Sequence, residues 1–120
     1  MLSFALLLLS ANVPSEWLYR ASDLLARCTS GFAADEGRCR GYISGVYDTV
    51  RAYEEWQSAR EICTPPKVTD LELRNTFVDF VSSHPDDLQA QAASVVVLAL
   101  RDKFSCRGAP RIRQPPKIGP

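Results

Sequence analysis

The stretch CRGYISGVYD, residues 39–48, decides how the rest of the sequence is interpreted. Its apolar side chains recur at helical spacing, and the same spacing continues downstream, which predicts a helix over residues 39–60. Gly41 and Gly45 lie inside that helix, where each costs about 1 kcal/mol relative to alanine. Because glycine lets another backbone approach, we expect close helix packing on the face that carries Gly41, Tyr42 and Gly45.

Three further segments show the same periodicity. One helix ends at Cys28, a short one opens at the capping box of Thr69 and Glu72, and the last begins at Pro85. The segment TSGFAADEGR, residues 29–38, is expected to be a loop. Four helices joined by short loops predict an all-α fold, a small up-down four-helix bundle with the last helix at its centre.

The four cysteines lie near the ends of these helices, which limits how they can pair. A disulfide needs α-carbons within about 7 Å of each other. In an up-down arrangement Cys28 and Cys39 meet at one end of the bundle. Cys63 and Cys106 meet at the other end. This pairing is therefore favoured over the two other connectivities.

The two ends of the chain differ in composition from the middle. Residues 1–11 hold an apolar run that is typical of a signal segment and too short to span a bilayer, so no stable membrane insertion is expected. Residues 15–106 form the expected helical domain. Residues 107–120 are basic and proline-rich and are interpreted as an extended tail, with a docking arm as the alternative. The even cysteine count favours an oxidising compartment and hence export.

The distribution of charge argues against a nucleic-acid partner. The whole chain has 14 basic and 14 acidic residues, but the tail has four basic residues and no acidic one, so residues 1–106 carry 10 basic and 14 acidic groups. Phosphate recognition needs a dense basic face, which this composition does not provide. A basic protein partner fits better.

Two exposed surfaces are candidates for binding a protein. In the segment 29–38, Phe32 stands close to Asp35 and Glu36, an arrangement suited to placing an aromatic anchor in a basic cleft. The alternative is an ordinary solvated connector.

The second candidate surface lies in the helix over residues 39–60. Tyr53, Glu54, Glu55 and Trp56 follow one another there, and Trp56 falls outside the main apolar stripe, which indicates an interface or burial under the tail. Asp48 is either a solvated charge or an acceptor for a neighbouring helix terminus.

The sequence offers little for catalysis. It contains one histidine, His84, whose place before a proline favours a cap or turn residue over a general base. With the cysteines assigned to disulfides, we expect neither a thiolate nucleophile nor a zinc site. No phosphate-binding glycine loop is present, so we expect no cofactor and a protein that is not an enzyme.

Several of these residues together resemble a known family. The matching positions in the first part are Cys39, Gly41, Tyr42, Ile43, Gly45, Val46 and Asp48. Those in the second part are Cys63, Pro65, Val68, Thr69, His84, Pro85, Ala99, Leu100, Phe104 and Cys106. Over residues 24–106 the chain is similar to the Rap/Tai family of type VI secretion immunity proteins.

The resemblance implies an all-helical, disulfide-containing protein of the periplasm, often dimeric, that blocks a peptidoglycan-cleaving amidase delivered by neighbouring cells. A small helical periplasmic chaperone or stress protein, or an envelope adaptor acting through its basic tail, is the alternative.

Overall fold

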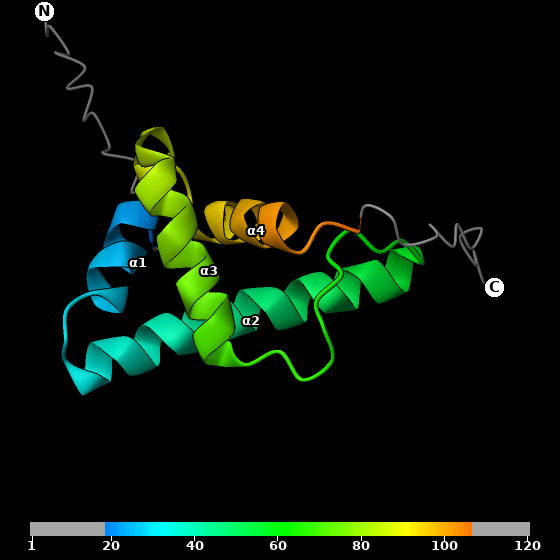
Figure 1. Cartoon of the computed structure of the whole chain (residues 1–120), viewed down its shortest axis with the longest axis horizontal. Helices are drawn as coiled ribbons and strands as arrows, with labels where there is room; N and C mark the ends of the chain where they lie inside the picture. Colours follow the sequence, from blue (N-terminus) through cyan, green and yellow to red (C-terminus); the bar gives the residue numbers. More distant parts are fainter. Residues whose placement is uncertain (1–18, 107–120) are drawn as a thin grey trace, which may run out of the picture.

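Five helical segments form along residues 19–106, the part of the chain that this computed structural model describes (Figure 1). They are α1 (Ala21–Cys28), α2 (Ala33–Gln57), α3 (Asp70–Ser83), the 3-10 helix η1 (Pro85–Gln89) and α4 (Ala92–Lys103). Within these residues, β-type backbone pairing is limited to two isolated bridges, between Arg20 and Gln91 and between Ile62 and Ser105. The prediction of an all-α fold with four α-helices is confirmed. The expected signal segment and basic tail lie outside the described residues.

The expected loop over residues 29–38 is wrong for most of its length. α2 begins at Ala33, so that only four residues, 29–32, connect it to α1. Asp35 and Glu36 lie in the first turn of α2, where carboxylates complement the positive end of the helix dipole. α2 also ends earlier than expected, at Gln57, because Ser58 adopts a left-handed conformation with φ 49°.

The capping box that opens α3 is confirmed. The backbone N–H of Glu72 donates to Thr69 Oγ1 (3.2 Å), and the backbone N–H of Thr69 donates to Glu72 Oε2 (2.7 Å). These two bonds satisfy amides that have no partner inside the helix, and they fix its first residue.

The segment from Pro85 onward is not one helix. Pro85 does open a helical turn, but that turn is η1, and α4 starts only at Ala92. The backbone between them is extended because it pairs with the entry to α1. Ala21 N–H donates to Ala90 O (2.9 Å), and Ala92 N–H donates to Tyr19 O (3.1 Å).

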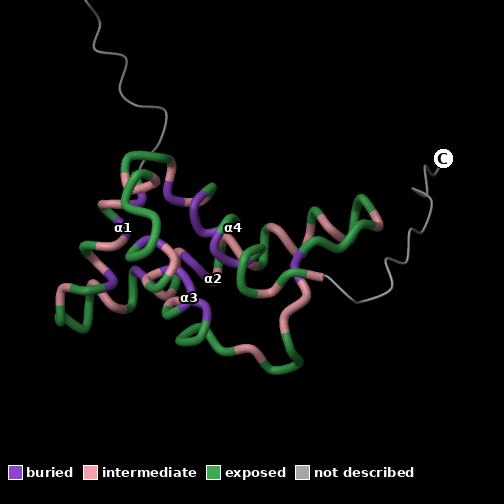
Figure 2. Tube along the Cα trace, turned by 45° about the horizontal axis from the view of Figure 1, so that its top comes forward, coloured by how far each residue is buried: buried purple, intermediate pink, exposed green. Residues whose placement is uncertain are grey.

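The helices pack around α2, which is the longest (Figure 1). α1 folds back beside the first half of α2, α3 crosses it steeply, and α4 lies along its middle (Figure 1). Each α-helix contacts the other three. α4 contributes more buried residues than any other helix: Ala92, Val95, Val96, Ala99 and Leu100. The buried segments gather where the helices meet, while the far end of α2 is exposed or half-buried (Figure 2).

Both disulfides form as predicted. Cys28 pairs with Cys39 with α-carbons 5.1 Å apart, and Cys63 pairs with Cys106 at 5.0 Å. The first joins the end of α1 to the first half of α2, and the second joins the segment after α2 to the segment after α4. The cross-links therefore fix both ends of the helical assembly.

Candidate functional site

A short, closed turn presents Phe32 to solvent. The turn lies between α1 and α2, and the Cys28–Cys39 disulfide closes it. Gly31 has φ 79°, a conformation that glycine adopts without strain, and Phe32 N–H donates to Ser30 Oγ (3.2 Å). The ring of Phe32 is 72% exposed at the N-cap of α2. The fold therefore holds a large apolar side chain in water on a backbone with little freedom.

The two acids expected beside Phe32 are engaged by arginines of the same chain. Arg27 Nη1 of α1 lies 3.2 Å from Asp35 Oδ1, and Arg74 Nε of α3 lies 3.3 Å from Glu36 Oε1. Arg74 also donates to the carbonyl of Cys28. These contacts connect α1, α2 and α3 below the turn, so both carboxylates have a structural partner within the fold.

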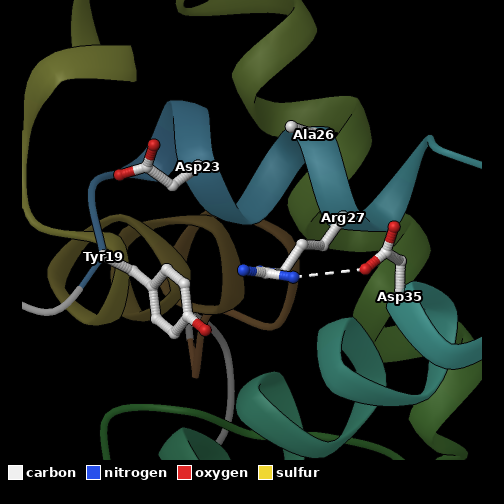
Figure 3. A pocket seen from close by; sticks show the side chains of 5 residues that line it. All are labelled: Tyr19, Asp23, Ala26, Arg27 and Asp35. Carbon is white, nitrogen blue, oxygen red and sulfur yellow. Dashed lines mark hydrogen bonds and ion pairs between the residues drawn. The ribbon is translucent and has the colours of Figure 1, made fainter.

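A shallow, open depression of about 490 Å³ lies next to this turn (Figure 3). It is lined by Tyr19, Asp23, Ala26, Arg27 and Asp35. The Arg27 guanidinium points between the Tyr19 ring, whose centroid is 5.3 Å away, and the Asp35 carboxylate (Figure 3). The lining carries one guanidinium, two carboxylates and an aromatic ring, so the depression is suited to a mixed protein surface rather than to one strongly charged ligand.

A second exposed aromatic surface lies at the other end of α2. Tyr53 and Trp56 are 54% and 74% exposed, and their rings meet edge to face with centroids 5.3 Å apart. Glu55 is exposed and has no ion pair within residues 19–106, whereas Glu54 turns inward to Arg51. The structure therefore brings Tyr53 and Trp56 together, leaves Glu55 exposed on an adjoining side of the helix, and directs Glu54 into the fold.

Arg51 anchors the chain that follows α2. Its Nη1 donates to Ile62 O (2.6 Å), its Nη2 donates to Thr64 Oγ1 (2.6 Å), and its Nε donates to Tyr47 Oη (3.1 Å). Glu54 Oε2 is 3.4 Å from the same guanidinium. Residues 62–64, which carry Cys63, therefore run back along α2. Sequence reasoning missed Arg51, because its partners lie outside any helical periodicity.

The expected close packing at Gly41 and Gly45 does not occur within the described residues. Both glycines are exposed, and a Cβ built on either one would meet no atom within 4 Å. Tyr42 does pack, with its ring 5.5 Å from that of Tyr19, and burial raises the pKa of its phenol. Asp48 is exposed without a partner in the described part, which agrees with the solvated alternative.

A scan against protein-family models matches residues 20–106 to the Rap1a immunity proteins. The chain belongs to this family. The match spans every described helix, both disulfides, Phe32 and the Tyr53–Trp56 pair, and it stops at Cys106. No curated protein and no solved structure matches the chain.

Membership of the Rap1a immunity proteins confirms the resemblance found in the sequence and implies a toxin or effector protein as partner. His84 is the C-cap of α3, stacked on Phe80 at 4.0 Å, which agrees with its interpretation as a cap. Within residues 19–106 no cluster of three or more histidine, cysteine or acidic side chains is arranged to hold a metal ion. Within the same residues, no helix is both long enough and apolar enough to cross a membrane.

Proposed function

We propose that this Rap1a immunity protein acts in the periplasm and neutralises a peptidoglycan amidase secreted by a type VI system, by covering the active site of the enzyme. The observation that carries the proposal is the exposure of Phe32, 72%, on a disulfide-closed turn in a chain of this family. Aromatic side chains in such positions are the usual anchors of protein interfaces.

The rigidity of the turn supports a role in binding. Association costs less when the contact residues are already held in their bound conformation. The Cys28–Cys39 disulfide and the ion pairs of Asp35 and Glu36 provide that support here. Phe32 would enter an apolar pocket of the amidase, and the adjoining depression around Arg27 would form the polar rim of the interface.

The periplasm fits the two cross-links, because disulfides persist in oxidising compartments. The proposed signal segment over residues 1–11 lies outside the described residues.

The experiment is a binding and inhibition assay with purified candidate amidases, beginning with any that is encoded beside the gene. Calorimetry gives the Kd, and release of muropeptides gives the residual amidase activity. We expect the unsubstituted protein to form a nanomolar complex. Phe32→Ala should raise Kd at least about 30-fold, which corresponds to the binding free energy of 2 kcal/mol or more that is lost when a hot-spot residue is truncated. Leu98→Ala is the matched control, because Leu98 is an exposed apolar residue on a different helix, α4. An equally tight complex with Phe32→Ala would place the interface elsewhere, and the absence of any complex would contradict the proposed partner.

The proposal includes a homodimer, as the family resemblance implies. The face at Gly41 and Gly45, which no helix within residues 19–106 covers, would accept a helix of the second copy. Analytical ultracentrifugation of the protein and of Gly41→Leu tests this, because leucine fits the open face of the monomer and blocks close helix packing. A monomer before substitution, or a dimer that survives it, would contradict this arrangement.

A further inference from the structure

The outer face of the second half of α2 is left uncovered by residues 19–106. Asp48 and Glu55, seven positions apart, lie on one line of the helix surface. Trp56 follows Glu55 about 100° further around the helix, and its ring meets the ring of Tyr53, which lies beyond it. All four side chains are exposed, and the two carboxylates have no ion pair within the described residues. We call these four residues the α2 outer face. The α2 outer face combines two aromatic rings in edge-to-face contact with two carboxylates that have no ion pair within the described residues.

The chain leaves the described structure next to this face. Cys106 is bonded to Cys63, and the adjoining Ile62 is bonded to Arg51, which is a helix-surface neighbour of Asp48 and Glu55. Cys63 N–H also donates to Phe104 O (2.7 Å), which holds the end of α4 to the same segment. Residue 107 therefore starts within a few residues' reach of the α2 outer face.

The segment that starts there has the complementary chemistry. Residues 107–120, RGAPRIRQPPKIGP, contain four basic side chains, four prolines and no acid. Residues 19–106 carry 10 basic and 13 acidic groups, an excess of the opposite sign. Proline-rich segments dock on grooves lined by aromatic rings, and arginine stacks on tryptophan and tyrosine. At about 3 Å per residue a proline-rich segment of this length reaches about 40 Å, whereas Asp48 to Trp56 spans only about 12 Å of helix.

We infer that the α2 outer face is a docking site for the basic, proline-rich segment 107–120 of the same chain. The arginines pair with Asp48 and Glu55, and the prolines and aliphatic side chains cover Tyr53 and Trp56. The segment lies beyond the family match, which ends at residue 106, so the contact is a property of this chain and is independent of the proposed function. It leaves Phe32 as the uncovered aromatic anchor and keeps the second aromatic surface from binding other proteins.

The test measures the accessibility of Trp56 in the full chain. Trp17→Phe leaves Trp56 as the only tryptophan. The tail variant changes Arg107, Arg111, Arg113 and Lys117 to glutamine in that background. We expect the acrylamide quenching constant of Trp56 to rise about twofold and its emission to shift to the red, because the indole loses the cover on one side. Circular dichroism and a thiol assay verify that fold and disulfides are unchanged.

Two controls make the result specific. Arg38→Gln removes an exposed basic charge ten positions before Asp48 on α2 and should leave the quenching constant unchanged. Asp48→Asn with Glu55→Gln should raise the quenching constant as much as the tail variant does. Combining these two substitutions with the tail variant should raise it little further. In the unmodified tail, raising NaCl from about 0.01 M to about 1 M should also expose Trp56, as the Debye length falls from about 30 Å to about 3 Å.

Two outcomes would overturn the inference. One is a quenching constant that neither the tail variant nor salt changes. The other is protection of Trp56 that grows with protein concentration and survives the tail variant, which would show that a second copy covers the face.

Discussion

At the scale of single residues, Arg51 does more than its place on an ordinary helix suggests. Its planar guanidinium donates to Tyr47, Ile62 and Thr64 at once. Only arginine offers several donors in one fixed fork. The side chain thus holds the segment of the second disulfide against α2.

Arg51→Lys should therefore destabilise the protein although charge is preserved. Lysine cannot reach the three acceptors together and leaves some of them without a donor, so we expect a loss of about 1–3 kcal/mol in the free energy of unfolding. Urea denaturation at neutral pH measures it. Arg38→Lys, at an exposed position without a described partner, should change little, and equal effects of both substitutions would refute the role of the fork.

Asp70 gives a pH dependence with a defined sign. Arg40 Nη2 and Nε bind its two carboxylate oxygens at 2.6 and 3.0 Å, and these hydrogen bonds lower the pKa of Asp70. A lowered folded-state pKa contributes stability above the unfolded value of about 4, and the contribution is lost as pH falls through the lowered value.

We expect Asp70→Asn to be less stable than the unsubstituted protein at pH 6, and the two to converge as the pH approaches 2. Urea midpoints at several pH values measure the difference. Asp79→Asn, an exposed carboxylate of α3 with no described ion pair, should show no such convergence because it starts with no difference. A gap between Asp70→Asn and the unsubstituted protein that stays constant down to pH 2 would contradict the assignment.

Residue-scale features were predictable where local chemistry decides them. The cysteine pairing followed from the positions of helix ends, and Thr69 and Glu72 formed the capping box that their spacing indicates. Arg51 was not predictable, because its partners approach only after the chain reverses at Ser58. The engagement of Asp35 and Glu36 by arginines likewise depends on where α1 and α3 lie.

At the scale of elements, α2 shows where helical periodicity fails as a guide. The first turns of α2 contain few large apolar residues, so hydrophobic periodicity does not predict a helix there. The acidic residues at its N-terminus do favour a helix. The split between η1 and α4 was equally hidden, since it results from hydrogen bonds with residues 19–21. Boundaries set by tertiary contacts are those that the sequence did not reveal.

Substitution of a helical glycine tests the open face of α2. Gly45→Ala should stabilise the protein by about 0.5–1 kcal/mol, because alanine is the better helix former and its methyl group meets no atom within 4 Å. Thermal unfolding at low protein concentration, where self-association contributes little, measures it.

Gly31→Ala is the contrasting control. Its φ of 79° is costly for alanine, so we expect destabilisation of about 1–2 kcal/mol. A destabilising Gly45→Ala would show that another group lies against that face.

At the scale of the whole molecule, the two disulfides differ in how much chain they restrain. Cys28 and Cys39 are 11 positions apart, whereas Cys63 and Cys106 are 43 apart. In the chain-entropy account, the longer loop contributes about 4 kcal/mol and the shorter about 3 kcal/mol.

We therefore expect Cys63→Ala with Cys106→Ala to lower the free energy of unfolding by about 1 kcal/mol more than Cys28→Ala with Cys39→Ala. Urea denaturation of the two double variants, each retaining the other disulfide, makes the comparison. A larger loss of unfolding free energy on removing the Cys28–Cys39 disulfide would mean that contacts of the turn at Phe32, rather than chain entropy, determine the contribution of that disulfide.

The bridge between residues 19–21 and residues 90–92 also bears on how the protein is made. The first helix receives its backbone partners from a segment about seventy positions later. A chain emerging from the ribosome cannot complete that contact until most of its length has been synthesised. The hydrogen bonds that join the entry of α1 to the start of α4 therefore form late, only after residues 90–92 have been synthesised.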